Sequence, residues 1–331
     1  LMWEVTDASL GNNIGQPIVA QVADGDWRVL LGNGPNSTDG IARLVMIQLS
    51  NGVRSTITTG VGGDNGLSGI NAWSAAGNGI VDTVYGGDLK GNLWRFNPAT
   101  ASASLLYAAG TTKPITATPL VARNPRTLQT WVFVGTGSYL NSADMSNTDV
   151  QTWYGLIDHG TTISSGLNSV SILAEGQVGG RDVRVIERLT TTGANGWYMN
   201  LLPPSGTRQG ERMVVPNFFQ GLTLIGTTRI PDADDVCSPS GKGFTMAIDP
   251  FTGGRLSGGF FDANGDGTVD GGDSLNGSPV SGIGYNSSPN NPIFLGDVMY
   301  TSLDDGTSAI TRTNASGSNL RRVSWRELIR D

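Results

Sequence analysis

The chain has 331 residues, of which 38% are apolar, 15% are charged and 48 are glycine. A formal net charge of −7, without a dense stripe of lysine and arginine, argues against nucleic acid or an anionic membrane surface as a partner. The single cysteine, Cys237, cannot form a disulfide within the chain, and no apolar stretch is long enough to span a bilayer.

The chain opens at Leu1 on the strand-like segment LMWEV, without an initiator methionine or a signal sequence. We therefore interpret residues 1–331 as a fragment of a longer protein. Short apolar strands separated by turns rich in Gly, Asp and Asn then recur along the chain. The paired apolar segments are residues 27–37 and 42–52, 80–100, 131–140 and 152–158, 222–230 and 243–254, and 297–313.

The clearest of these units is residues 80–100, IVDTVYGGDLKGNLWRFNPAT. Its pattern predicts a strand from Val81 to Tyr85, a tight turn from Asp88 to Gly91, and a second strand from Asn92 to Asn97. Strands that are apolar on both faces must pack against similar units. Each unit is therefore expected to be one of several stacked sheets.

Imperfect repeats of two to four antiparallel strands, roughly 40–50 residues apart where regular, are typical of propeller blades. The spacing here is irregular, with long insertions between residues 141 and 220. The sequence thus predicts an all-β fold, a modified and distorted β-propeller with quinoprotein-like blades, with a pair of β-sandwiches as the second choice. Trp94, Tyr154 and Trp197 lie in strands and are expected to pack between blades. The final segment RRVSWRELIRD is expected to form a short helix or a closing strand.

An acidic segment, DANGDGTVDGGD, occupies residues 262–273. Counted from Asp262, oxygen-bearing side chains stand at positions 1, 3, 5, 9 and 12, with glycine at position 6, which is the arrangement of a calcium-binding EF-hand loop. Oxygen donors of this kind favour Ca²⁺ over Mg²⁺ or Zn²⁺. The predicted ligands are Asp262, Asn264, Asp266, the carbonyl of Thr268, Asp270 and Asp273.

Two features separate this segment from an EF-hand. Position 12 is Asp273, which is shorter than the usual Glu, and the flanking segments GGRLSGGFF and SLNGSPVSGIG do not have helical patterns. The loop is therefore expected to lie between strands as a structural clamp, without the helix pair that opens in calcium sensors. The alternative is a turn cluster of Asp, Asn and Gly residues that caps only its own backbone.

Other candidate sites lack the groups that their chemistry requires. His159 lies in a turn, DHGTT, without an orienting acid and a nucleophile nearby, so no catalytic residues are assigned. Cys237 follows three aspartates, which would raise its pKa, and could pair with a cysteine in an upstream part of the protein. The GNGPNS segment at residues 32–37 lacks the helix and lysine of a phosphate-binding loop.

Several phrases, in order along nearly the whole chain, resemble the C-terminal domain of the PilY family of type IV pilus tip-associated adhesins and assembly factors. They are GQPIVAQVADGDWRVLLGNGPNS, VDTVYGGDLKGNLWRFN, VFVGTGSYL, the segment from GERMVV to DPFTGG, and the terminal SWREL. The resemblance implies a modified β-propeller with a calcium site in an EF-hand-like loop. The family pattern falls on Asp262, Asn264, Asp266 and Asp270, with the Thr268 carbonyl between the last two, whereas Asp273 is inferred as a ligand from spacing alone.

The resemblance also implies a function at the bacterial surface. The expected location is the pilus tip, reached through the periplasm and outer membrane. The expected partners are pilins or minor pilins and a host or abiotic surface, without nucleic acid or a small-molecule substrate. Calcium is implied to govern pilus extension against retraction, and the domain to support twitching motility and attachment. Gly180-Arg181-Asp182 has the wrong order for an Arg-Gly-Asp motif, so integrin binding is not carried over.

Two other functions remain open. A quinoprotein-type dehydrogenase propeller also binds calcium, beside a quinone cofactor, but the contiguous loop leaves few coordination positions for one and the chain has no adjacent pair of cysteines. A purely structural domain would hold its ion permanently. The sequence favours a non-enzymatic, calcium-binding pilus module over both.

Overall fold

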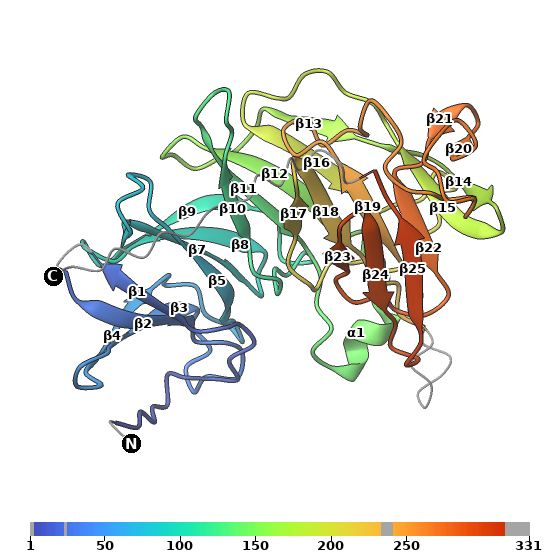
Figure 1. Cartoon of the computed structure of the whole chain (residues 1–331). Coiled ribbons are helices and arrows are strands. Elements are labelled where there is room, and N and C mark those ends of the chain that lie inside the picture. The colour runs from blue at the N-terminus through green and yellow to red at the C-terminus, as the bar shows by residue number, and fades with distance from the viewer. Residues whose placement is uncertain (1–2, 23–24, 233–240, 315–331) are drawn as a thin grey trace, which may run out of the picture.

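The computed structural model describes residues 3–22, 25–232 and 241–314, and β-strands form nearly all of its regular structure (Figure 1). Cys237 and the terminal RRVSWRELIRD, about which the sequence raised expectations, lie outside the described residues. The one described helix is α1 (Ser142–Ser146), and no helix in the described ranges is long and apolar enough to cross a membrane.

The first sheet contains five strands in the order β4-β3-β2-β1-β6. Its antiparallel members follow the chain, and β6 is added in parallel to the open edge of β1. Its strands are β1 (Ile18–Val22), β2 (Trp27–Gly32), β3 (Arg43–Gln48), β4 (Arg54–Thr58) and β6 (Ile80–Val81).

The second sheet is four-stranded and antiparallel, in the order β5-β7-β8-β9. Its strands are β5 (Leu67–Trp73), β7 (Thr83–Asp88), β8 (Asn92–Asn97) and β9 (Ser102–Ala108). The predicted hairpin of residues 80–100 is present with one correction: the strand expected over Val81–Tyr85 is divided at Asp82. The residues before Asp82 pair with β1 in the first sheet, so this short connection joins two sheets.

The third and fourth sheets have the orders β10-β11-β12-β16-β13 and β14-β15-β22-β19-β18-β17. The insertion between residues 141 and 220 contributes strands to both sheets, so it is part of the layered core. The third sheet consists of β10 (Leu120–Arg123), β11 (Thr130–Gly135), β12 (Thr152–Asp158), β13 (Leu167–Val170) and β16 (Gly196–Asn200). The fourth consists of β14 (Ile172–Val178), β15 (Arg181–Ile186), β17 (Phe218–Gln220), β18 (Thr223–Thr227), β19 (Gly243–Ile248) and β22 (Gly282–Tyr285).

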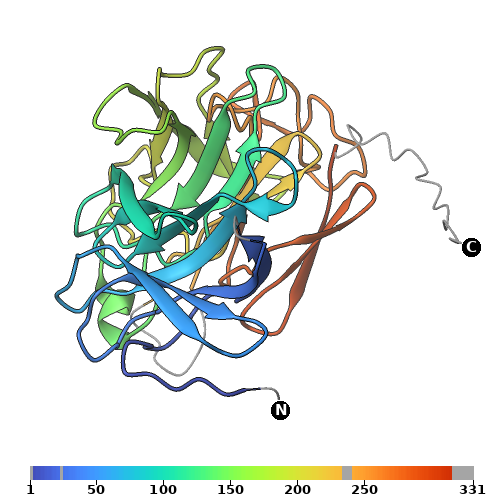
Figure 2. The ribbon, with the colours of Figure 1, turned by 90° about the vertical axis from the view of Figure 1, so that its left-hand side faces the viewer.

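A three-stranded sheet and a small hairpin complete the described chain. They are β23 (Ile293–Leu295), β24 (Val298–Ser302) and β25 (Ser308–Arg312), and β20 (Ser274–Leu275) with β21 (Ser278–Pro279). In Figure 1 the sheets follow one another across the molecule in nearly chain order, and in Figure 2 the first sheet faces the viewer.

The core is divided into four clusters, each between neighbouring sheets. One lies between the first and second sheets, one between the second and third, one between the third and fourth, and one between the fourth sheet and β23–β25. Trp94, Tyr154 and Trp197 are 8%, 3% and 0% exposed and belong to three of these clusters, as expected from the sequence. This face-to-face packing confirms the all-β prediction and is the layering expected of propeller blades.

Polar side chains buried at strand ends connect the first two sheets. Asn33, within the GNGPNS segment, accepts hydrogen bonds at Oδ1 from the backbone N–H groups of Arg43 and Leu67, both at 3.0 Å. Asn65 donates from Nδ2 to the Val61 carbonyl, which follows β4, at 3.1 Å and to Oδ2 of Asp88, in β7, at 3.0 Å. Since these groups are buried, their bonds replace water and fix the turns of one sheet against the next. Residues 32–37 therefore form a turn that also holds the first sheet against the second.

Candidate metal-binding loop

The predicted calcium loop, residues 262–273, lies between strand segments. Phe261 forms an isolated antiparallel bridge with Thr313, and the Asp262 N–H donates to the Arg312 carbonyl at 2.9 Å. At the other end, Asp273 leads into β20, and its carbonyl accepts from the Val280 N–H at 3.0 Å. The loop is thus connected at both ends to hydrogen-bonded backbone, without flanking helices, as the sequence predicts.

Asp262 organises the first turn of the loop. Its side chain is almost completely buried and accepts from the N–H of Gly265 at 2.7 Å through Oδ1 and from that of Gly267 at 2.9 Å through Oδ2. Both glycines have positive φ, at +78° and +92°, which a residue with a Cβ atom adopts only at a cost. The local sequence therefore folds the backbone around one carboxylate.

Asp273 closes the loop and is the most buried of its carboxylates, at 0% exposure. Oδ1 accepts from the N–H groups of Ala263 at 2.6 Å and Asn264 at 3.0 Å, and Oδ2 accepts from the N–H of Asp270 at 2.9 Å. Three backbone donors compensate a charge that has been removed from water. Spacing assigned Asp273 as a metal ligand. In the structure its visible role is closure of the loop, and its role as a ligand stays a prediction.

The remaining predicted ligands lie on the rim of the loop. Asn264 is half-buried, whereas Asp266, Thr268 and Asp270 are exposed. The Asn264 side chain donates to Asp266 Oδ2 at 2.9 Å, and the Thr268 hydroxyl donates to Asp266 Oδ1 at 2.7 Å and to Asp270 Oδ2 at 3.4 Å. Hydrogen bonds from Thr268, and then from Asn264, lower the pKa of Asp266 below its ordinary value. This carboxylate is therefore an anion at neutral pH.

The chemistry of these groups fits a hard cation. Every predicted donor is an oxygen, and the set combines carboxylates with one amide and one backbone carbonyl, which is the mixture that calcium loops use. Within the described ranges, no group of three or more His, Cys, Asp or Glu side chains is clustered closely enough to hold a metal ion. A continuous chain of hydrogen bonds joins the side chains of the rim, Asn264, Asp266, Thr268 and Asp270. The carboxylates of Asp266 and Asp270 do not converge with that of Asp262 on one point in the described structure.

The hairpin of β14 and β15 packs against the loop. A Cβ atom at Gly179 would lie 2.6 Å from Cα of Asn264, so only glycine permits this approach. Beside it, the guanidinium of Arg181 donates from Nη1 to the Asp262 carbonyl at 3.3 Å and to the Thr311 hydroxyl at 3.4 Å. Arg181 therefore joins the loop to β25. The sequence did not predict the contacts of Gly179 and Arg181 with the loop, because both residues lie far before it in the chain. Arg181, for example, precedes Asp262 by 81 residues.

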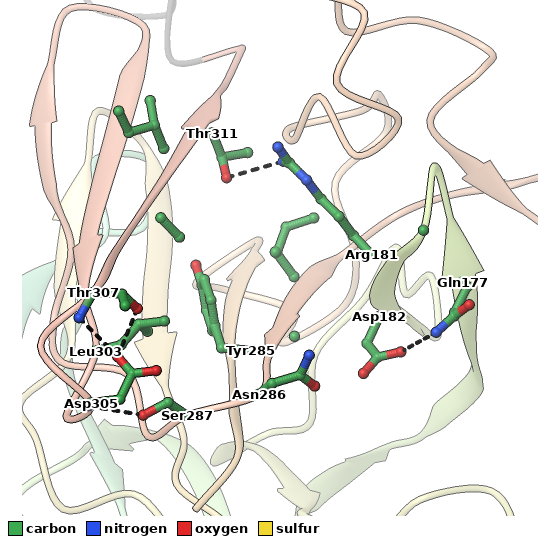
Figure 3. A pocket seen from close by; sticks show the side chains of 15 residues that line it. Gln177, Arg181, Asp182, Tyr285, Asn286, Ser287, Leu303, Asp305, Thr307 and Thr311 are labelled. Atoms are coloured by element: carbon green, nitrogen blue, oxygen red, sulfur yellow. Dashed lines mark hydrogen bonds between the residues drawn. The ribbon is translucent and has the colours of Figure 1, made fainter. Parts of the chain in front are cut away.

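A cavity of about 430 Å³ is lined in part by Arg181, which also bonds to the loop (Figure 3). β15, β22 and the β24–β25 hairpin supply its walls. Asp182, which bonds to Gln177, faces it from one side, and Asp305, which bonds to Thr307, from the other. The cavity thus lies beside the loop and contains two carboxylates and one guanidinium.

The one histidine of the sequence, His159, contacts the backbone of a neighbouring segment. His159 is exposed, and its Nε2 lies 3.1 Å from the carbonyl oxygen of Ala194. No hydrogen bond to an acid or a nucleophilic side chain is formed by it among the described residues. The ring therefore has a local structural contact and no partner for general acid–base chemistry.

The comparisons with known proteins agree on one family. A family model described as the PilY1 beta-propeller domain matches residues 4–104. A "Type IV pilus biogenesis factor PilY1 homolog" of Xylella fastidiosa is 50% identical over 341 residues, covering 100% of this chain and 28% of the relative. The "Type IV pilus biogenesis factor PilY1" of Pseudomonas aeruginosa strain PAO1 is 29% identical, covering 82% of this chain and 28% of the relative.

A solved structure extends the match to the whole fold. The crystal structure of the Pseudomonas aeruginosa PilY1 C-terminal domain aligns with a TM-score of 0.77 and 26% identity, covering 95% of this chain and 76% of that one. The propeller-like fold predicted from the sequence is thereby confirmed. The chain spans less than a third of the length of the two curated relatives, at 28% of each.

Proposed function

Because the chain belongs to the PilY1 family and corresponds to its C-terminal domain, we propose that it is the calcium-binding propeller domain of a type IV pilus biogenesis factor. The relatives' names support the role in pilus biogenesis. The observation that carries the calcium proposal is the loop of residues 262–273, whose backbone is folded by Asp262 and Asp273. This fold leaves Asn264, Asp266 and Asp270 on an oxygen-rich rim.

Charge explains what an ion would do for the loop. Four aspartates lie within twelve residues, and the lowered pKa of Asp266 keeps that carboxylate charged. Their repulsion opposes any conformation that brings the rim oxygens together. A divalent cation offsets two of the charges and favours the converged arrangement over others, so binding stabilises the folded state by mass action. Asp262, Asn264, Asp266, the Thr268 carbonyl and Asp270 are the proposed ligands, and Asp273 is a further ligand candidate.

The contacts of the loop provide a route from the ion to the surrounding sheets. Asp262 bonds to the backbone of Arg312 just after Thr311 in β25, and Asn264 packs against Gly179 between β14 and β15. A fixed loop therefore holds the last sheet against the fourth sheet. Calcium would then determine how firmly these two sheets are joined, which is a physical basis for control of a partner-binding surface.

The wider biological role follows from the family assignment as a proposal. The domain acts outside the cell at the pilus tip, contacts pilins or minor pilins and a host or abiotic surface, and supports pilus extension against retraction, attachment and twitching motility. The proposed role does not involve catalysis of a reaction. If the ion is exchanged at environmental calcium concentrations, the loop is a switch; if it is always bound, the loop is a permanent structural site.

Calcium titration of the metal-free protein, followed by calorimetry and by melting temperature, tests the proposal. The expected result is one bound ion and a stabilisation of about 2.7 kcal/mol when free calcium is 100 times Kd. Asp270→Ala and Asp266→Asn are each expected to abolish this gain. The same substitutions should increase proteolysis near residues 262–273 when calcium is present.

Asp305→Asn is a matched control for Asp266→Asn. Asp305-Gly306-Thr307 has the same sequence as Asp266-Gly267-Thr268, and in both turns the aspartate accepts from the N–H and the hydroxyl of the threonine. Both substitutions therefore remove one charge from an aspartate with the same threonine contacts. The proposal requires that Asp305→Asn keeps the calcium response. Equal calcium responses in all four proteins would contradict it.

A further inference from the structure

A second cavity, of about 360 Å³, lies between the second and third sheets, far along the chain from the metal-binding loop. It is open to solvent, and residues 164–167, which precede and enter β13, are part of its lining. We call it the Tyr–Lys pocket, after the tyrosines and the lysine in its lining, which includes Tyr107, Lys113, Tyr154, Tyr198 and Asn200.

Lys113 places a positive charge in this pocket without a compensating carboxylate. Its Nζ donates to the Thr152 hydroxyl at 2.7 Å, and that hydroxyl donates onward to Asn200 Oδ1 at 2.9 Å. Among the described residues, no acidic side chain forms an ion pair with Lys113. Burial lowers the pKa of Lys113, as expected for an ammonium group that has lost part of its water and gained no anion. The site therefore favours a negative ligand.

The aromatic lining cannot neutralise this charge. The rings of Tyr107 and Tyr154 lie 5.1 Å apart between centroids, and Tyr198 stands opposite Tyr154 across β12 and β16. Burial raises the pKa of both Tyr107 and Tyr154 above the ordinary value, so their phenols remain neutral at physiological pH. They present hydroxyl groups and ring surface, the combination with which tyrosine contacts polar ligands.

The Tyr–Lys pocket and the cavity of Figure 3 differ in charge. That cavity is lined by Asp182 and Asp305, and its Arg181 bonds to a backbone carbonyl of the metal-binding loop. None of the residues lining the Tyr–Lys pocket is acidic. In addition to the five residues named above, the lining consists of Ala109 and the segment 164–167, Ser-Ser-Gly-Leu. A cationic, hydroxyl-lined pocket is unexpected in a chain with a net charge of −7.

We propose that the Tyr–Lys pocket binds a small ligand that carries a carboxylate on a hydroxylated ring, the chemistry of a sugar acid. Lys113 binds the carboxylate through a charge-assisted hydrogen bond. The Asn200 amide and the hydroxyls of Ser164 and Ser165, which also line the pocket, would bond to ring hydroxyls, and Tyr198 would offer an aromatic surface to the apolar face of the ring. The volume of about 360 Å³ is in the range of sites for small molecules.

Titration with D-glucuronate, followed by calorimetry or ligand-detected NMR, tests the assignment, with D-glucose as the neutral sugar and acetate as the isolated carboxylate. The expected glucuronate Kd is about 1 mM, at least about tenfold below that of either comparison ligand. High salt should weaken glucuronate binding because part of the attraction is Coulombic. Equal binding of glucuronate and glucose, equal binding of glucuronate and acetate, or no binding of glucuronate overturns the proposal.

Lys113→Met removes the charge and keeps a side chain of similar length. It should weaken glucuronate at least about tenfold, while Lys242→Met, which removes the same charge from an exposed position outside the pocket, should leave binding unchanged. If Lys113→Met does not fold, Tyr198→Leu, which removes the aromatic surface offered to the ring, tests the same pocket and should reduce binding. Unchanged binding in the folded pocket variant refutes the site, whatever the outcome of the calcium experiments.

Discussion

Asp273→Asn separates the two roles that this residue could have, closure of the loop and coordination of an ion. Asparagine keeps the size and shape of the side chain but replaces one oxygen with an NH₂ group and removes the charge. If the remaining oxygen still accepts from Ala263 and Asn264, the NH₂ group faces the N–H of Asp270, which Oδ2 now binds at 2.9 Å. Two donors then oppose each other in a fully buried position.

The cost can be worked out from these contacts. One hydrogen bond to a charged acceptor is lost and its donor stays buried, which costs about 1.5–3 kcal/mol. The two remaining bonds, at 2.6 and 3.0 Å, weaken because their acceptor is now neutral. We expect a total loss of about 3 kcal/mol in the free energy of unfolding, or a fall of about 4 °C in melting temperature for a chain of 331 residues.

The assay is thermal unfolding of the wild type and Asp273→Asn in excess chelator, so that no metal contributes. Asp305→Asn serves as the surface control because its carboxylate is exposed and should change the melting temperature little. The large loss should appear in chelator if Asp273 closes the loop. A variant that melts like the wild type in chelator but no longer binds calcium would refute this reasoning and assign Asp273 as a ligand.

Two further predictions concern charged groups elsewhere. Glu211→Gln should destabilise the fold by about 3 kcal/mol in denaturant unfolding, because it breaks a buried two-bond pair with Arg184 at 2.7 and 2.8 Å. Glu175→Gln, which changes the more exposed of the two glutamates that bond to this arginine, should cost less than half as much, and equal losses would contradict this ranking. The lowered pKa values of Asp266 and Asp305 mean that each carboxylate contributes stability above the ordinary value of 3.8, and that this contribution is lost as the pH falls through the lower folded-state pKa. The melting-temperature differences between the wild type and Asp266→Asn or Asp305→Asn, measured without metal, should therefore be small but present at neutral pH, because both carboxylates are exposed, and should shrink on acidification below that value. Differences that stay constant would show that the charged forms are not favoured by folding.

Local patterns predicted much of the fold because alternation and turn residues act over short distances. The hairpin around Asp88–Gly91 and the strand Asn92–Asn97 follow directly from such patterns. The division of the expected Val81–Tyr85 strand could not be predicted, because it results from pairing of Ile80–Val81 with β1, about 60 residues earlier along the chain.

The same limit applies to the candidate sites. Spacing identified every acidic residue of the loop but could not distinguish the buried, backbone-bonded Asp273 from the exposed Asp270, since both are aspartates in register. The positions of Gly179 and Arg181 depend on how the fourth sheet packs against the loop. The charge of Lys113 becomes informative only when the structure shows that no carboxylate pairs with it among the described residues.

The most direct test of the calcium proposal is a crystal structure of this domain grown with excess calcium, with anomalous scattering used to locate the ion. The account predicts one ion within about 2.3–2.6 Å of oxygens from Asp262, Asn264, Asp266, Thr268 and Asp270. Density in which those oxygens stay apart, bonded only to water and to each other at saturating calcium, would contradict it.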